Sequence, residues 1–285
     1  MALDDTWFTE VCDEAGSAFS IKINAKLHEE QTPFQRIAIY DTTQFGKLMT
    51  IDGFVMLTSR DNFIYHEMMS HPAMFTHASP RRVLIIGGGD CGTLREVLRH
   101  DDVEQVWQVD IDERVTRLSE TYFPELCQQN RDVRAQLLFA DGIQWVKDAS
   151  DYSIDVIIVD STDPIGPAEG LFNQAFYRQC HRALRRGGLL VQQSESPFYH
   201  QRLLKDIHDA MRRADFVDIK LLNYPQPVYP SGWWSTTIAC KDEPIGGFRE
   251  SDAQNKSFTT RYYNADIHRA ALAMPEFCKE AGLGQ

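Results

Sequence analysis

The sequence predicts an α/β fold in which a Rossmann-like sheet follows a small N-terminal antiparallel β domain. Residues 19–58 alternate apolar and polar side chains, as strands with one buried face do. After Pro80, short apolar runs alternate with amphipathic stretches of helix length, which is typical of a parallel sheet with crossover helices. A glycine-rich turn, residues 87–92, follows the first of these runs. We therefore expect a β-strand domain over residues 1–60 and a larger Rossmann-like domain over residues 61–285.

The N-terminal domain is predicted from two alternating runs and the turn after them. Residues 34–40 and 47–51 each place apolar side chains at every second position over part of their length. Asp52 and Gly53 then separate the second run from a further apolar run, in the manner of a two-residue hairpin turn.

The larger domain is predicted as strands separated by helices. The expected strands are Val83–Ile86, Val106–Asp110, Gln136–Ala140, Val156–Asp160 and Leu189–Gln193, with a last strand near Thr236–Cys240. The expected helices are Thr93–Arg99, Glu113–Leu126, Ile143–Lys147, Ala175–Leu184 and Gln201–Ala214.

Composition and charge exclude several classes of protein. The chain has 285 residues, 29 Lys and Arg against 41 Asp and Glu, and hence a net charge of 29 − 41 = −12, which repels nucleic acid on average. The negative net charge would attract a cationic substrate. Many soluble proteins, however, are acidic simply to stay dissolved. The six cysteines have neither disulfide-framework nor zinc-ligand spacing, and no run approaches the roughly 20 apolar residues of a membrane span. We expect a cytoplasmic protein with no nucleic-acid or membrane partner.

The glycine-rich turn indicates a nucleotide site. Gly87, Gly89 and Gly92 fit the pattern G-x-G-x-x-G between a strand and a helix, where missing side chains let a ligand approach the backbone. Asp110 ends the next strand 20 residues after Asp90, where a carboxylate can accept hydrogen bonds from ribose hydroxyls. Its alternative role is to cap the following helix.

Two further features refine the ligand. Asp141, followed by Gly142, ends the third strand at the level of an adenine amino group, although a helix cap is an equal interpretation. Asp90 follows the glycines directly and places negative charge where a dinucleotide would put its pyrophosphate. A nucleoside that carries a sulfonium, of the S-adenosylmethionine type, satisfies the ribose, adenine and charge requirements together.

Paired acids follow the fourth strand. Asp160 and Asp163 lie three residues apart just beyond its carboxyl end, and Pro164 stops the strand pattern. Either acid alone could serve an Asx-turn or a cap. Both together, at the sheet edge where α/β proteins bind ligands, favour a second binding region.

At this point the chain resembles the spermidine synthases, or polyamine aminopropyltransferases, whose loops look like GGGDGG and D-[SC]-[ST]-D-P-x-G-P. The resemblance extends over nearly the whole chain and includes residues 63–68, 193–197, 229–232 and 261–264. It implies a methyltransferase-type Rossmann-like fold and transfer of the aminopropyl group of decarboxylated S-adenosylmethionine to putrescine or a related amine. No metal or cofactor is expected beyond this co-substrate, and a homodimer or homotetramer built through the N-terminal strands is expected. The acceptor stays open among putrescine, cadaverine, agmatine and spermidine.

The resemblance also implies roles for residues at matching positions. Asp160 would accept the proton of the attacking amine, and Asp163 would stay ionised and hold the amine. Asp90 would bind the ammonium of the donor, and Gln35 with Asp110 its nucleoside. The remaining expected substrate contacts are Tyr65, His66, Asp141, Gly142, Pro167, Gln193 and Tyr229, with Gly87, Gly88 and Gly89 forming the nucleotide loop.

Three departures from the family pattern affect these expectations. Cys91 stands where relatives usually have glycine, which constrains the turn unless its φ is negative. Asp110 replaces a Glu and is one methylene shorter. Asn62 replaces an acid and removes a charge expected near the amine channel.

Two other functions compete with this prediction. A methyltransferase of the same fold would explain the glycines, Asp110 and Asp141, but an acid at Asp90 would repel the carboxylate of a methionine-containing donor. A non-catalytic polyamine or nucleoside sensor would keep the pocket without turnover.

Overall fold

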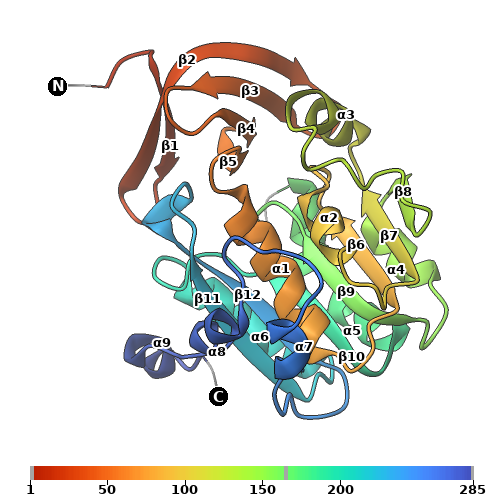
Figure 1. The fold of residues 1–285 in the computed structure, drawn as a ribbon. Helices are drawn as coiled ribbons and strands as arrows, with labels where there is room; N and C mark the ends of the chain where they lie inside the picture. Colours follow the sequence, from red (N-terminus) through yellow and green to blue (C-terminus); the bar gives the residue numbers. More distant parts are fainter. Residues whose placement is uncertain (1–2, 164–165, 284–285) are drawn as a thin grey trace.

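Two β-sheets joined by helix α1 form the framework of the protein, shown as a ribbon in Figure 1. This computed structural model describes residues 3–163 and 166–283. The N-terminal sheet has the order β1-β2-β3-β4-β5, and each strand pairs antiparallel with the next. Its strands are β1 (Trp7–Cys12), β2 (Ser17–Gln31), β3 (Arg36–Thr42), β4 (Lys47–Ile51) and β5 (Phe54–Thr58).

The predicted hairpin turn in this sheet is confirmed. Asp52 and Gly53 have φ values of 52° and 92°, as both central residues of a type I′ turn require. The sheet begins earlier than predicted, because β1 pairs with the first part of β2.

The second sheet has seven strands in the order β11-β12-β10-β9-β6-β7-β8. Strands β8, β7, β6, β9 and β10 are parallel neighbours, whereas β12 runs antiparallel between β10 and β11. The strands are β6 (Arg82–Gly87), β7 (Gln105–Asp110), β8 (Ala135–Phe139), β9 (Ile154–Asp160), β10 (Leu184–Gln193), β11 (Asp218–Pro225) and β12 (Trp233–Cys240). The predicted parallel strands are confirmed, and β11 was not predicted.

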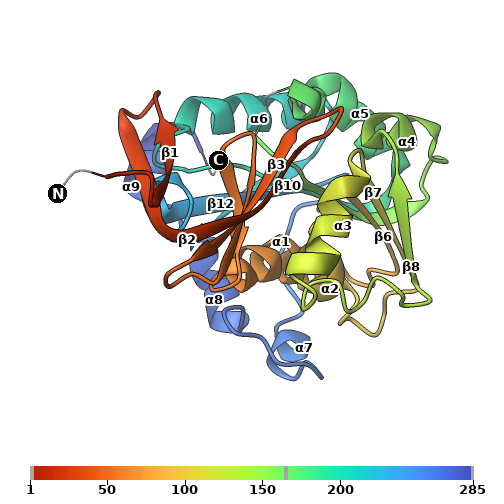
Figure 2. The same cartoon turned by 90° about the horizontal axis from the view of Figure 1, so that it is seen from above.

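Helices cover both faces of the larger sheet. Figure 2 shows α4, α5 and α6 on one side of it and α1 and α2 on the other. Alternate residues of β6 follow this division: Val83 and Ile85 join the core under α1, and Leu84 and Ile86 join the core under the opposite helices. The helices are α1 (Asn62–Thr76), α2 (Gly92–Val97), α3 (Glu113–Tyr122), α4 (Gly142–Asp148), α5 (Gln174–Ala183), α6 (Gln201–Arg213), α7 (Glu250–Gln254), α8 (Ala265–Ala271) and α9 (Glu276–Glu280), with 3₁₀ turns at Gly166–Phe172 and Pro230–Gly232.

The N-terminal sheet is held over one end of the larger sheet. Ile37, Met49 and Leu57 of the small sheet form one core with Val115 and Leu118 of α3. This packing places β3, β4 and β5 opposite the carboxyl ends of the parallel strands, as Figures 1 and 2 show. The space between the two sheets therefore becomes the place where a ligand can be enclosed.

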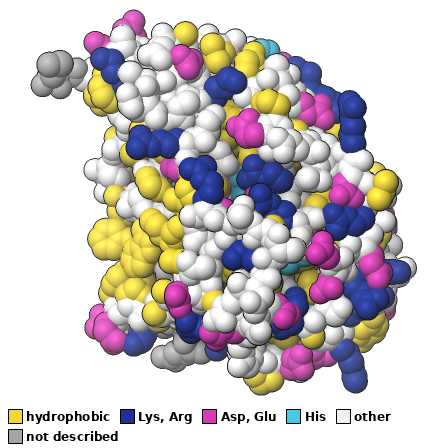
Figure 3. Space-filling view, in the orientation of Figure 1, with side chains coloured by type: hydrophobic (Ala, Val, Ile, Leu, Met, Phe, Trp, Pro, Cys, Tyr) yellow, Lys and Arg dark blue, Asp and Glu magenta, His cyan; other side chains and the backbone are white. Residues whose placement is uncertain are grey.

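The exterior carries charges of both signs. On the face drawn in Figure 3, Lys and Arg side chains lie among Asp and Glu side chains, and hydrophobic side chains gather at the edge below the β1–β2 hairpin. Of the helices in the described ranges, none combines the length and apolarity needed to cross a bilayer.

Candidate active site

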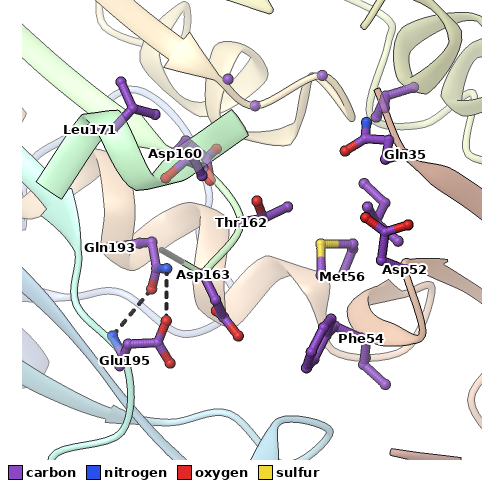
Figure 4. Close-up of a pocket in the computed structure, with 18 of the residues that line it drawn as sticks. Gln35, Asp52, Phe54, Met56, Asp160, Thr162, Asp163, Leu171, Gln193 and Glu195 are labelled. Carbon is purple, nitrogen blue, oxygen red and sulfur yellow. Dashed lines mark hydrogen bonds between the residues drawn. The ribbon is translucent and has the colours of Figure 1, made fainter. Parts of the chain in front are cut away.

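A cavity of about 450 Å³ lies between the two sheets at the carboxyl ends of β6 to β10. From β6 the strand order continues through β7 and β8 on one side, whereas β9 and β10 lie on the other side. The order therefore reverses between β6 and β9, and ligands of such folds usually bind at this point. Figure 4 shows side chains from both sheets pointing into this cavity, with Asp160 and Glu195 on one side and Gln35 and Asp52 on the other.

The glycine-rich turn brings two strand ends into contact. Gly87 has a φ of 80°, and a Cβ there would lie 2.2 Å from the carbonyl oxygen of Asp160. The N–H of Gly88 donates to the same oxygen at 2.7 Å. Only glycine at position 87 allows this approach, so the turn fixes the end of β9 beside the nucleotide loop.

Asp160 is held at both carboxylate oxygens. The Tyr65 hydroxyl from α1 donates to Oδ1 at 2.6 Å, and the Thr93 hydroxyl from α2 donates to Oδ2 at 2.6 Å. Burial and the nearby charge of Asp90 raise the pKa of Asp160. A carboxylate with a raised pKa and a fixed orientation is suited to accept a proton near neutral pH.

Asp90 forms an ion pair behind the nucleotide loop. Its Oδ1 accepts the N–H of Gly92 at 2.6 Å, and its Oδ2 lies 3.2 Å from Nε2 of His66. Burial opposes ionisation of both groups, yet their mutual attraction raises the pKa of His66 and lowers that of Asp90. Because a Cβ at Gly92 would lie 2.1 Å from the His66 ring, glycine is required there as well.

Asp110 and Asp112 divide two tasks at the end of β7. Asp110 lines the cavity, its Oδ1 accepts the N–H of Asp112 at 2.8 Å, and burial raises its pKa to about 7. The N-cap of α3 is Asp112, whose side chain accepts the N–H of Arg114. The alternative that Asp110 caps this helix is therefore wrong.

Gln35 joins the small sheet to the same region. Its Nε2 donates to Oδ2 of Asp112 at 3.1 Å, and the Thr32 hydroxyl donates to that oxygen at 2.7 Å.

Asp141 caps α4 by accepting the N–H of Ile143 at 2.8 Å, and it also lines the cavity. The two predicted roles of Asp141, helix cap and ligand contact, are therefore compatible.

Three acids converge at the other end of the cavity, namely Glu10, Asp163 and Glu195. The side chains of Asp163 and Glu195 interact with each other, and burial raises the pKa of both carboxyl groups. Burial and the charge of Glu195 raise the pKa of Asp163 well above its ordinary value. That Asp163 is ionised when it holds the amine stays a prediction.

Glu195 is fixed in an uncommon backbone conformation, with a φ of 66°. Its N–H donates to Oε1 of Gln193 at 3.1 Å, and Nε2 of Gln193 donates back to its Oε1 at 3.2 Å, as the dashed lines in Figure 4 mark. Nδ1 of His200 lies 3.2 Å from its other carboxylate oxygen. The strained backbone is thus stabilised by several contacts that aim this acid at the cavity.

Aromatic rings separate the acidic regions. The Tyr65 and Tyr229 ring centroids lie 5.9 Å apart, and Trp234 contacts Tyr229 at 4.7 Å. The Tyr229 hydroxyl donates to the carbonyl of Met56 at 2.6 Å and so connects the two sheets across the cavity. These rings form an apolar wall along which an alkyl chain can lie.

Most of the predicted site residues meet in this cavity. Those that line it are Gln35, Tyr65, Gly87, Gly88, Gly89, Asp90, Asp110, Asp141, Gly142, Asp160, Asp163, Gln193 and Tyr229. His66 is 1% exposed and lies behind Asp90 instead of lining the cavity. The side chain of Pro167 lies outside the described part of the chain.

The departures from the family pattern have structural consequences. Cys91 has a φ of 68°, so a residue with a side chain occupies the left-handed conformation here. Asn62 is buried and donates to the carbonyl of Thr58 at 2.8 Å, away from the cavity lining, so the expectation of a lost charge near the amine channel is not supported.

Sequence reasoning missed four residues that shape the site: Glu10, Thr93, Asp112 and His200. The motif D-x-D at 110–112 could have indicated Asp112, since an acid just before a helix is a common N-cap. Nothing in the sequence indicated Glu10 as a site residue, because the strand that contains it had not been predicted.

Comparison with known proteins agrees with this geometry. A family model described as "Spermine/spermidine synthase domain" matches residues 62–246, and one described as "Spermidine synthase tetramerisation domain" matches residues 6–59. A polyamine aminopropyltransferase of Methylococcus capsulatus is 65% identical over 275 residues, with 96% of each chain covered. Another, of Thioalkalivibrio sulfidiphilus, is 63% identical and covers 98% of this chain and 99% of its own.

Solved structures match as well. A spermidine synthase in complex with the transition-state analogue AdoDATO is 35% identical and superposes with a TM-score of 0.93, covering 99% of this chain and 96% of its own. The spermidine synthase of Thermotoga maritima is also 35% identical, with a TM-score of 0.91 and coverages of 96% and 93%.

Proposed function

Because the chain belongs to the spermine/spermidine synthase family, we propose that it transfers the aminopropyl group of decarboxylated S-adenosylmethionine to putrescine or a related amine. The products are spermidine, or the corresponding longer amine, and methylthioadenosine. The observation that carries this proposal is Asp160, held by Tyr65 and Thr93 inside a cavity that has an acidic region at each end.

Asp160 acts as the proton acceptor in this proposal. An aliphatic amine has a pKa of about 10, so most of it is protonated at neutral pH and has no lone pair for attack. Asp160 removes the proton directly or through water. The nitrogen lone pair then attacks the methylene beside the sulfonium, the carbon–sulfur bond breaks, and its electrons neutralise the sulfur. The side chains around the two substrates supply orientation and charge for this displacement.

The donor occupies the end formed by β6, β7 and β8. Asp110 accepts hydrogen bonds from the ribose, Asp141 and Gly142 contact the adenine, and Asp90 binds the aminopropyl ammonium. Gln35 closes the nucleoside region from the small sheet. His66 is a positioning residue that holds Asp90, so His66→Gln should raise the KM for the donor and leave the KM for the acceptor nearly unchanged.

The acceptor occupies the end formed by Glu10, Asp163 and Glu195. Its reacting nitrogen lies near Asp160, its alkyl chain runs along Tyr65 and Tyr229, and its second ammonium binds to Asp163 and Glu195. A dication thus supplies the positive charge that these buried acids need.

A methyltransferase remains the competing function that the experiment must exclude. The protein should be incubated with an amine panel and either S-adenosylmethionine or its decarboxylated form, and the products identified by mass. Methylthioadenosine and a longer amine, formed only with the decarboxylated donor, support the proposal. S-Adenosylhomocysteine would support methyl transfer, and binding of both substrates without product would support a sensor.

Replacement of the proton acceptor tests the mechanism. In Asp160→Asn the amide keeps its shape but cannot take a proton, so kcat should fall by about 100-fold or more. The Kd for the donor, measured by calorimetry, should change little. Near-normal turnover in this variant would remove Asp160 from the mechanism.

We further propose a homodimer or homotetramer that assembles through the N-terminal sheet. The match of residues 6–59 to a tetramerisation domain supports this assembly. Light scattering should give two or four times the 32.7 kDa of one chain, and a monomer would contradict this. We also propose that the chain divides into domains 1–60 and 61–285. A cytoplasmic location belongs to the same proposal and is consistent with the six free thiols.

A further inference from the structure

Two cysteines, Cys91 and Cys127, lie in or beside the glycine-rich turn of residues 87–92 and have no part in the proposed reaction. Cys91 directly follows Asp90, is fully buried, and has the left-handed φ of 68°. Cys127 lies after α3, and its thiol is near enough to the thiol of Cys91 to interact with it. Its Sγ also lies 3.7 Å from the carbonyl oxygen of Asp90. Both sulfur atoms therefore contact the segment that positions Asp90.

The two thiols differ in access. Cys127 is half-buried and lines a surface cavity together with Arg117, Asn130 and Arg131. Cys91 is enclosed, and Nε2 of Gln108 lies 3.5 Å from its sulfur. A small oxidant in the surface cavity can reach Cys127 first, and Cys91 is then in place to resolve the oxidised sulfur.

We propose that Cys91 and Cys127 form a reversible disulfide under peroxide and that this disulfide weakens donor binding. The thiolate of Cys127 attacks one peroxide oxygen, the O–O bond breaks, and the leaving hydroxide takes up a proton to give water and a sulfenic acid. The sulfur of Cys91 then attacks that sulfur, the S–O bond breaks, and a second water leaves with the proton of Cys91. The two thiols lose two electrons in total, and a dithiol reductant restores them.

In the reduced protein, Cys91 and Cys127 should react slowly with peroxide. Hydrogen bonding to Cys91 and burial raise the pKa of the Cys127 thiol, so little of the reactive thiolate is present. The disulfide should therefore form under strong oxidation and not under ordinary reducing conditions.

The consequence for the donor rests on the proposed function. The N–H of Cys91 donates to the carbonyl of Gly88 at 2.8 Å, and its carbonyl accepts the N–H of Arg95 at 3.0 Å, so Cys91 fixes the start of α2. Bonding to Cys127 requires the sulfurs to approach to about 2 Å. This movement shifts the backbone between Asp90 and Gly92, whose N–H orients the Asp90 carboxylate.

Peptide mapping tests the disulfide directly. Peroxide-treated protein is alkylated and digested with trypsin, which separates residues 83–95, containing Cys91, from residues 118–131, containing Cys127. We expect these peptides to be joined and two hydrogens lighter than their sum. Calorimetry with the decarboxylated donor should show about tenfold or greater loss of affinity, the value of one charged hydrogen bond, with recovery after dithiothreitol.

Two variants control the experiment. Cys127→Ser should bind the donor like the wild type and lose the response to peroxide. Cys12→Ser, which removes another half-buried thiol, should keep the joined peptides. Absence of the joined peptides, or their presence with unchanged donor affinity, would overturn the inference. Failure of the reduced protein to bind the donor would instead contradict the proposed function, since the peptide map does not depend on turnover.

Discussion

Glu10 brings a carboxyl group from β1 into the acceptor end of the cavity, where its Oε2 accepts the N–H of Val55 at 2.6 Å. Burial raises its pKa from 4.5 to about 7. Between these two pH values the folded protein holds a proton that the unfolded chain has lost. The free energy of unfolding should therefore fall as the pH rises through this window and level off above about pH 7.

Removal of this ionisable group should flatten the pH dependence. Glu10→Gln keeps an oxygen for the N–H of Val55 but has no charge to bury. We expect the variant to be more stable than the wild type at pH 8 by about 2 kcal/mol, and to differ little near pH 4.5. Urea unfolding at both pH values checks this, with the exposed Glu14→Gln on the same hairpin as the control. An equal difference at both pH values would show that burial of charge is not the cause.

The acids show what a sequence can and cannot indicate about single residues. Asp90, Asp110 and Asp160 were predictable because each follows a recognisable strand or glycine turn, and strand ends meet at one sheet edge. The raised pKa of Asp163 was not predictable, because it depends on burial and on Glu195, a side chain from a different loop.

Helix α1 connects three parts of the molecule through consecutive residues. Tyr65 donates to Asp160, and His66 pairs with Asp90. Glu67 accepts the backbone N–H groups of Arg261, Tyr262 and Tyr263 at 2.9, 2.9 and 2.8 Å. The C-terminal segment is therefore anchored to the same helix that orients Asp160.

The Glu67 carboxylate should contribute strongly to stability, because it is 2% exposed and accepts three backbone N–H groups, of which that of Tyr263 is buried. Glu67→Ala leaves these N–H groups without acceptors, and we expect the free energy of unfolding to fall by about 3 kcal/mol. Glu67→Gln keeps one amide oxygen and should lose less. Urea unfolding measures both variants, and a loss below about 1 kcal/mol in Glu67→Ala would show that water or other groups replace the carboxylate.

Elements that were missed share a physical cause. All residues of α1 are buried except Phe63 and Thr76, so it lacks the polar face on which helix prediction depends. Strand β1 lies at the edge of its sheet, and β11 lies at the edge of the larger one, where side-chain alternation is less constrained. The parallel strands were predictable because burial on both faces gives continuous apolar runs.

At the scale of the whole molecule, charge and shape act together on the substrates. The net charge of −12 attracts cations from a distance, and in the proposed function the enclosed acids bind the amine at short range. The small sheet supplies part of the cavity and contributes Glu10, so its position over the larger sheet completes the acceptor end.

Long-range attraction should make acceptor capture sensitive to salt. Raising the ionic strength from about 0.05 M to about 0.5 M shortens the Debye length several-fold, so the KM for putrescine should rise several-fold. The value of kcat should change little, because contacts inside the closed cavity are screened less. Asp13 and Glu14 are exposed where the β1–β2 hairpin meets the cavity, and a double variant with Asp13→Asn and Glu14→Gln should have a higher KM at low salt and a weaker salt dependence. Equal salt dependence in variant and wild type would place the attraction in the buried acids alone, and so would assign capture to the cavity instead of its entrance.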